Sequence, residues 1–223
     1  MTVFFKIQLF EMVNFMYCYI FGALPINSFD FKIQKDDIVI AADSGLINTQ
    51  KLNIKPDYVI GDFDSLGHKP SSKNTITYPI EKDDTDTMLA VKLGFEKGYR
   101  SFRIFGCIGG RLDHTFANIQ TAAYIVENGG EAVFYADKEN FTVIKNSHIE
   151  FNKAHQGNIS IFALEESKNV TIKGTYYELE NGCLSTDFPL GTSNKFNNKD
   201  VSISVEQGKL LIIWESQGEN DEK

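Results

Sequence analysis

The sequence predicts an α/β fold in which a Rossmann-like, mainly parallel sheet with helices on both faces is followed by an antiparallel β-sandwich. Up to about Ala136, short apolar runs alternate with segments of helical pattern, which implies right-handed crossovers between parallel strands. After about Phe141, short runs rich in Val, Ile, Tyr and Phe are separated by turn clusters, which favours antiparallel strands. We therefore place an α/β domain at residues 1–138 and a β-sandwich domain at residues 139–223.

The elements of the first domain are expected in a regular order. Strands are predicted at about Phe15–Gly22, Ile38–Asp43, Asp57–Ser65, Phe102–Gly110 and Glu131–Asp137. Helices are predicted at Ser44–Asn53, Thr85–Gly98 and His114–Gly130. The second helix has the clearest ends, because Thr85 is a candidate N-cap and Gly98 stands where a helix would close.

The second domain is expected to consist of short strands of period two. They are predicted at Phe141–Asn146, Asn158–Leu164, Asn169–Leu179, Val201–Glu206 and Lys209–Ser216. The turn clusters HQGN, ENG, NNKD and EQG lie among these runs. Regularly spaced turns of this kind indicate a sandwich or barrel.

The composition excludes several classes of protein. The formal net charge is −8, which argues against a general nucleic-acid-binding surface. The apolar stretch Val3–Leu24 is interrupted by Lys6 and Glu11 and lacks a basic region before it, so we expect neither a membrane span nor a signal peptide. The three cysteines have no metal-ligand or disulfide spacing. These features predict a cytoplasmic protein with reduced thiols.

Acidic residues follow the expected strands at one edge of the predicted sheet. Ligands of open α/β sheets bind beyond the carboxyl ends of the strands. The candidates at these ends are Asp43, Asp62, Asp64, Asp83, Asp84 and Asp86. Carboxylates gathered in one place repel one another, and such groups are tolerated when they share a hard cation such as Mg²⁺. The sequence therefore predicts a metal–polyphosphate site at this edge, with Asp84 as a solvated neighbour.

Each acidic motif alone also fits a structural role. Aspartate is common in turns and helix N-caps, and the G-D-x-D motif at Gly61–Asp64 is short. Asp83 and Asp86 are three residues apart, so they lie on one side of a forming helical turn, which is also an acceptable capping arrangement. Their shared position at one edge of the sheet is what favours the metal site.

The segment Gly106–Asn118 supplies the positive counterpart. Glycines before a helix let backbone N–H groups approach phosphate, and the helix N-terminus favours negative charge, although Gly109 and Gly110 also fit a plain tight turn. The guanidinium of Arg111 suits bidentate bonds to phosphate oxygens. His114 and Asn118 are four residues apart and share a helix face. Neither a Walker motif nor G-x-G-x-x-G occurs.

Taken in order, five motifs form a series that resembles the one of thiamine pyrophosphokinases. They are AADSG (Ala41–Gly45), PDYVIGDFDS (Pro56–Ser65), EKDDTDT (Glu81–Thr87), GCIGGRLDHTFANI (Gly106–Ile119) and LGTSNKF (Leu190–Phe196). The resemblance runs from about residue 20 to 215, and the series is far more specific than any one motif. Two segments depart from the family's pattern: FGALPIN, where a Gly-rich strand end is expected, and GCLSTDFPL.

The resemblance implies transfer of the pyrophosphoryl group of ATP to the hydroxyl of thiamine, with release of AMP. It also implies Mg²⁺ and a homodimer whose sandwich domain helps form the thiamine site. The implied metal ligands are Asp43, Asp62, Asp64 and Asp86, and the last three of these are the expected catalytic residues. ATP contacts are expected at Asp43, Lys82, Asp83, Thr85, Gly110, Arg111, Asp113, His114 and Asn118. Thiamine contacts are expected at Ser193, Asn194 and Trp214.

Several alternatives stay open at this point. Trp214 equally fits core packing, because a slip of one residue in a strand turns a side chain to the other face. A pyrophosphokinase of the same fold that acts on another alcohol, such as a hydroxymethyl-pterin, is opposed by the sandwich domain. A D-x-D phosphohydrolase with Asp62 as nucleophile needs a separate catalytic lysine. A non-catalytic nucleotide or thiamine sensor has less need for four metal-directed carboxylates.

Overall fold

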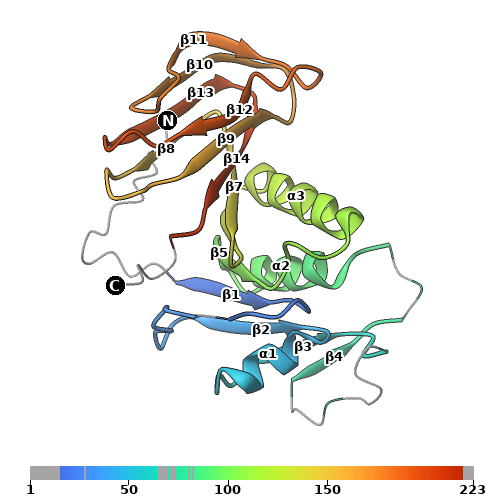
Figure 1. Cartoon of the computed structure of the whole chain (residues 1–223). Helices are drawn as coiled ribbons and strands as arrows, with labels where there is room; N and C mark the ends of the chain where they lie inside the picture. Colours follow the sequence, from blue (N-terminus) through green and yellow to red (C-terminus); the bar gives the residue numbers. More distant parts are fainter. Residues whose placement is uncertain are drawn as a thin grey trace, which may run out of the picture. The chain divides into compact units, whose positions relative to one another are not determined.

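The structure is a computed structural model that describes residues 16–27, 29–64, 70, 74–79, 81 and 83–217 (Figure 1). These residues divide into two compact units on either side of the Asp137–Lys138 bond. The N-terminal unit contains the helices, and the C-terminal unit consists of strands and turns.

The sheet of the N-terminal unit is parallel throughout, as predicted. Its strands, in spatial order, are β6 (Glu131–Tyr135), β5 (Ser101–Phe105), β1 (Tyr17–Phe21), β2 (Ile38–Ala42), β3 (Tyr58–Gly61) and β4 (Thr75–Thr77). The short edge strand β4 was not predicted, because the run Thr-Ile-Thr is too short to show a pattern. Chain order reverses beside β1, since β2 to β4 lie on one side of it and β5 and β6 on the other. This reversal point is where ligands of open α/β sheets bind.

The three predicted helices are present as α1 (Gly45–Lys51), α2 (Asp86–Glu96) and α3 (Leu112–Glu127). The predicted N-cap of α2 is confirmed, because the Thr85 hydroxyl accepts a hydrogen bond from the Met88 backbone N–H at 3.2 Å. Gly98 follows the end of α2 with a positive φ of 93°, as expected for a helix closed by glycine. α3 begins two residues earlier than predicted, directly after Arg111.

Both faces of the parallel sheet are covered (Figure 1). On one face, α2 packs so closely that a methyl group placed on Gly94 would lie 2.6 Å from the Phe102 ring. The opposite face is buried under Leu46 of α1 and under the aromatic connection between β1 and β2, which includes Phe29 and Phe31. Side chains alternate between the two faces because successive residues of a strand point in opposite directions.

The C-terminal unit forms antiparallel strand pairs, as the turn pattern predicts. One set runs in the order β12 (Gly191–Lys195), β9 (Asn158–Ala163), β14 (Lys209–Glu215) and β7 (Glu139–Lys145). The other set runs in the order β11 (Leu179–Leu184), β10 (Ser167–Lys173), β13 (Val201–Gln207) and β8 (His148–Phe151). β8, β11 and β12 were not predicted, because the first is short and the other two lack a regular apolar alternation.

Among the helices of the residues that the structure describes, none combines the length and the apolar character that a bilayer crossing requires.

Candidate active site

Three of the predicted aspartates meet at the carboxyl ends of β2 and β3. Asp43 directly follows β2, whereas Asp62 and Asp64 follow β3. One carboxylate oxygen of each residue lies within 4.8 Å of those of the other two. The exposure rises along the group, from buried Asp43 through intermediate Asp62 to exposed Asp64. We call these three residues the aspartate group.

Local backbone geometry explains how the aspartate group forms. The Asp43 backbone N–H donates to the Ile60 carbonyl at 2.7 Å, which extends the pairing of β2 with β3 to the residue that carries the carboxylate. A methyl group placed on Gly61 would lie 3.1 Å from Asp43 Cα, so glycine permits this close approach. Gly61 was not among the predicted site residues, although its place directly before D-x-D at a strand end was the available signal.

The aspartate group fits a divalent cation. Asp43 Oδ1 is buried and accepts no hydrogen bond from any residue that the structure describes. Asp43 Oδ2 accepts a bond from the Ser44 hydroxyl at 3.2 Å. A buried carboxylate oxygen without a donor is costly unless a cation satisfies it. Mg²⁺ prefers oxygen ligands from one or two carboxylates, waters and phosphates, and the aspartate group offers oxygen alone.

Asp86 is not among the described residues whose carboxylate oxygens lie within 4.8 Å of one another in the aspartate group. Asp86 is the first residue of α2, where a carboxylate also complements the helix dipole. Asp83 is exposed, and Asp84 forms an ion pair with Lys92 at 2.6 Å. The predicted contact residue Lys82 lies outside the described residues. The Thr85 hydroxyl, also a predicted ATP contact, already caps the helix.

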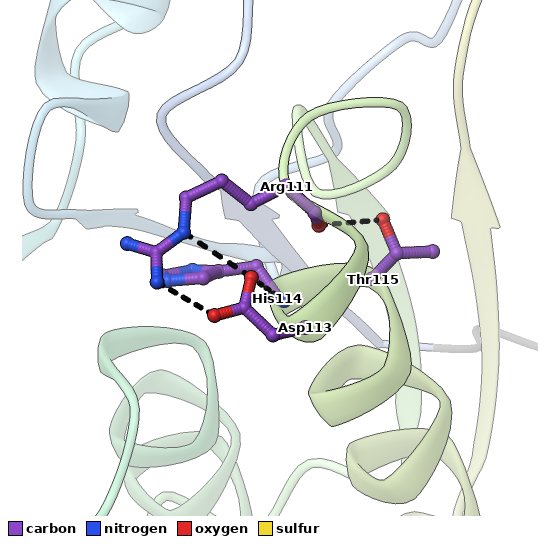
Figure 2. Close-up of polar contacts among 4 residues, drawn as sticks. All are labelled: Arg111, Asp113, His114 and Thr115. Carbon is purple, nitrogen blue, oxygen red and sulfur yellow. Dashed lines mark hydrogen bonds and ion pairs between the residues drawn. The ribbon is translucent and has the colours of Figure 1, made fainter.

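The first turn of α3 carries a bidentate ion pair. Arg111 Nη2 and Nε donate to the two carboxylate oxygens of Asp113 at 2.6 and 3.2 Å. The hydrogen bond from Arg111 holds the pKa of Asp113 below its usual value. Figure 2 shows the guanidinium, the Asp113 carboxylate and the His114 ring on one side of this turn, with Thr115 on the other. The Arg111 side chain is 74% exposed, so a phosphate would reach it from solvent.

Two further predicted ATP contacts, Asn118 and Gly110, each contact another segment of the chain, although Gly110 itself is exposed. Asn118 is buried, and its Nδ2 donates to the Cys107 carbonyl at 2.8 Å, which ties α3 to the loop after β5. A methyl group placed on Gly110 would lie 2.9 Å from Cδ2 of Leu24. The shared helix face of His114 and Asn118 therefore does not make them equivalent, because His114 is exposed and Asn118 is not.

The predicted thiamine-side residues all lie in the C-terminal unit. Asn194 is buried, and its amide bonds the backbone of Tyr177 in both directions, with Nδ2 donating at 2.7 Å and Oδ1 accepting at 2.9 Å. Ser193 is exposed, with a φ of 57°, and its backbone N–H donates to the Ser160 hydroxyl at 3.0 Å. Asn194 thus holds together the two segments that carry exposed Ser193 and exposed Tyr177.

Trp214 lies in the core of the C-terminal unit. Its exposed fraction is 7%, and its ring packs edge-on against Phe151 with 5.2 Å between ring centroids. This environment agrees with the alternative stated from the sequence, in which Trp214 packs in the core. A thiamine contact by Trp214 stays a prediction.

Two family models match the chain. "Thiamin pyrophosphokinase, catalytic domain" matches residues 29–134, and "Thiamin pyrophosphokinase, vitamin B1 binding domain" matches residues 146–210. The chain belongs to the thiamin pyrophosphokinase family. The chain is also 26% identical over 182 residues to the thiamine pyrophosphokinase of Bacillus subtilis (strain 168), a match that covers 78% of this chain and 85% of that protein.

Solved structures of this family share the fold. The Bacillus subtilis thiamine pyrophosphokinase superposes with a TM-score of 0.80 at 23% identity, covering 91% of this chain and 100% of the other. The Geobacillus thermodenitrificans thiamin pyrophosphokinase gives 0.77 at 24%, covering 92% and 99%. Yeast thiamin pyrophosphokinase gives 0.69 at 15%, covering 95% and 91%. The predicted fold class, a parallel α/β sheet followed by antiparallel strands, is therefore that of the family.

Proposed function

We propose that this protein transfers the pyrophosphoryl group of ATP to the hydroxyl of thiamine, giving thiamine diphosphate and AMP. The observation that carries the proposal is the aspartate group, with its unpartnered buried oxygen on Asp43, in a chain of the thiamin pyrophosphokinase family. That oxygen calls for a cation, and a cation beside three carboxylates is suited to hold a triphosphate.

In the proposed reaction, the thiamine hydroxyl oxygen attacks the β-phosphorus of ATP. A bond forms between that oxygen and the β-phosphorus, while the bond from the β-phosphorus to the oxygen bridging it to the α-phosphorus breaks. AMP leaves with the bridging oxygen, and the hydroxyl proton passes to a neighbouring carboxylate. Reactions of this class depend mainly on positioning and on charge stabilisation.

The chain's own residues have distinct parts in this proposal. Asp43, Asp62 and Asp64 would hold Mg²⁺, which supplies positive charge to the phosphate oxygens when bound. Asp86, at the start of α2, is assigned to the same metal only as a prediction. Arg111 binds phosphate oxygens from the first turn of α3, and Asp113 orients its guanidinium.

Thiamine recognition is assigned to the C-terminal unit. This unit has a hollow lined by residues 161–163 of β9 and by residues 184–189 and 191, and Ser193 follows the last of these by two positions in the chain. The match of residues 146–210 to a vitamin B1 binding domain supports this assignment. A homodimer in which this unit completes the thiamine site, and a cytoplasmic location, belong to the same proposal.

The proposal is tested by supplying the purified protein with ATP, Mg²⁺ and thiamine, and by measuring AMP and thiamine diphosphate. We expect both products in equal amounts, and neither when thiamine or Mg²⁺ is omitted. A parallel reaction with a hydroxymethyl-pterin tests the alternative acceptor. Consumption of the pterin in place of thiamine would overturn the assignment of substrate, and ATP binding without any product would favour a sensor.

A further inference from the structure

The residues after β1 lie at the point where chain order reverses, next to the loop that carries Arg111. The segment Gly22–Leu24, which directly follows β1, is called the β1 loop. Contacts on both sides hold its backbone.

On the α1 side, the β1 loop is held by Asn48. This side chain is 5% exposed, and its Nδ2 donates to the carbonyls of Gly22 and Leu24, both at 2.8 Å. The Asn48 amide nitrogen has two hydrogens, so both are used. α1 begins two residues after Asp43. The same short helix therefore follows the buried carboxylate of the aspartate group and anchors the β1 loop.

On the α3 side, the β1 loop is bonded to the loop after β5. The backbone N–H of Gly22 donates to the Phe105 carbonyl at 2.7 Å, and that of Leu24 donates to the Gly106 carbonyl at 2.9 Å. The β1 loop and the loop after β5 pack closely, because a methyl group on Gly22 would lie 2.5 Å from Cys107 Sγ. The Leu24 side chain packs against Gly110, directly before Arg111.

We propose that Asn48 is a positioning residue for ATP. Its two hydrogen bonds fix the β1 loop, and the Leu24 side chain then supports the backbone at Gly110 that presents Arg111. A chain of direct contacts thus sets the Arg111 loop at a defined distance from the aspartate group. This inference rests on the proposed function for the identity of the ligand, but the contacts themselves do not depend on it.

The direction of the Asn48 bonds separates this role from ordinary helix packing. Thr49, the next residue of α1, is also fully buried, but its hydroxyl donates to the Leu46 carbonyl within the same helix. Asn48 instead donates to the carbonyls of Gly22 and Leu24, which precede it by 26 and 24 positions in the chain. Loss of the Thr49 bond weakens α1 itself, whereas loss of the Asn48 bonds releases the β1 loop.

The test uses Asn48→Asp, which keeps the shape of the side chain but replaces two donors with an acceptor facing two carbonyls. We expect the KM for MgATP to rise about tenfold, because the loop that carries Arg111 is displaced. The KM for thiamine should stay within twofold, because this loop is assigned to ATP alone. Hydrogen exchange should accelerate at the Leu24 amide and in residues 106–111. Thr49→Val is the matched control, and it should leave both KM values and the exchange of residues 106–111 unchanged.

A second variant covers the case in which Asn48→Asp does not fold. Leu24→Ala keeps the backbone bonds but removes the support of Gly110, and it should raise the KM for MgATP in the same selective way. Equal changes in both KM values, or the same KM shift in Thr49→Val, would overturn the proposal. If the wild-type protein forms no thiamine diphosphate, the proposed function fails. In that case the exchange of residues 106–111 in Asn48→Asp still decides whether Asn48 holds this loop.

Discussion

Asp43 carries a carboxylate at a buried position with an uncommon backbone conformation. Its side chain is 8% exposed, its backbone has a positive φ of 47°, and Oδ1 is unpartnered among the described residues. Outside glycine, a positive φ is uncommon, and aspartate is among the residues that tolerate it. Strain and an unsatisfied buried oxygen at one residue indicate that function, not stability, determines this side chain.

Replacing this carboxylate should therefore separate stability from activity. In Asp43→Asn we expect activity to fall by about 100-fold or more, because a charged ligand at the reacting phosphates is lost. Without Mg²⁺, its melting temperature should equal or exceed that of the wild type. Added Mg²⁺ should raise the melting temperature of the wild type only, as measured by thermal unfolding with and without the metal.

Asp84→Asn is the matched control, because Asp84 is paired with Lys92 and lies outside the aspartate group. It should retain both activity and the Mg²⁺-dependent rise in melting temperature. If Asp43→Asn kept that rise, Asp43 would not be a metal ligand.

Gly61 controls the distance between the two parts of the aspartate group. In Gly61→Ala the new methyl group must push β3 away from Asp43 Cα, which it would approach to 3.1 Å. We expect Mg²⁺ affinity, measured by calorimetry, to fall about tenfold. Gly98→Ala is the control for stability, because Gly98 has a φ of 93° but open space around it. An equal loss of Mg²⁺ affinity in Gly98→Ala would mean that Gly61 acts only through stability.

At the scale of elements, the N-terminus of α3 presents the guanidinium group of Arg111. Lysine keeps the charge of Arg111 but cannot reproduce its two parallel bonds. We expect Arg111→Lys to raise the KM for MgATP about tenfold and to leave the KM for thiamine unchanged in steady-state assays. Arg100→Lys is the control, since Arg100 donates to the carbonyls of Phe95 in α2 and of Tyr99 after it. A normal KM for MgATP in Arg111→Lys would remove Arg111 from the ATP site.

The pairing of β5 with β6 carries a pH dependence. Burial raises the pKa of Glu131 above its ordinary value of 4.5, although a bond from the Ser101 hydroxyl at 2.7 Å opposes the rise. The folded state then binds the proton of the Glu131 carboxyl group more tightly than the unfolded state does. The contribution of this group to stability is complete below pH 4.5 and falls as the pH rises through the raised pKa.

Glu131→Gln should remove that fall while keeping an acceptor for Ser101. Urea unfolding should show the variant as stable as the wild type, or more so, at pH 7, with the difference between them smaller at pH 4. Glu180→Gln, an exposed position on β11, should show no such pattern. A variant that is less stable than the wild type at pH 7 would contradict the assignment of a burial penalty to Glu131.

The sequence revealed elements wherever local signals are strong. The apolar runs of β1, β2 and β3 and the cap at Thr85 are local, so they were predicted. β12, whose sequence is GTSNK, has no apolar pattern, because its pairing depends on β9 and on the Asn194 bonds to Tyr177, which is 17 residues away. A single sequence shows nothing of such tertiary bonds.

At the scale of the whole molecule, strand order determines which predicted residues meet. β2 and β3 are neighbours, so Asp43 and Asp62, which directly follow them, converge as expected. Asp86 follows β4 at the edge of the sheet, and position along the chain alone could not decide whether it joins them. The hydrogen bonds of Asn48 were likewise hidden, because its partners lie in the β1 loop, which has no sequence motif.

The proposed function requires that the bond broken in ATP joins the β-phosphorus to the oxygen that bridges it to the α-phosphorus. It is tested by supplying Mg²⁺, thiamine and ATP labelled at the β-phosphorus, and by following the label with time. We expect all transferred label to appear in thiamine diphosphate and the AMP released to be unlabelled. Label that appears in ADP, with thiamine monophosphate as the other product, would contradict pyrophosphoryl transfer.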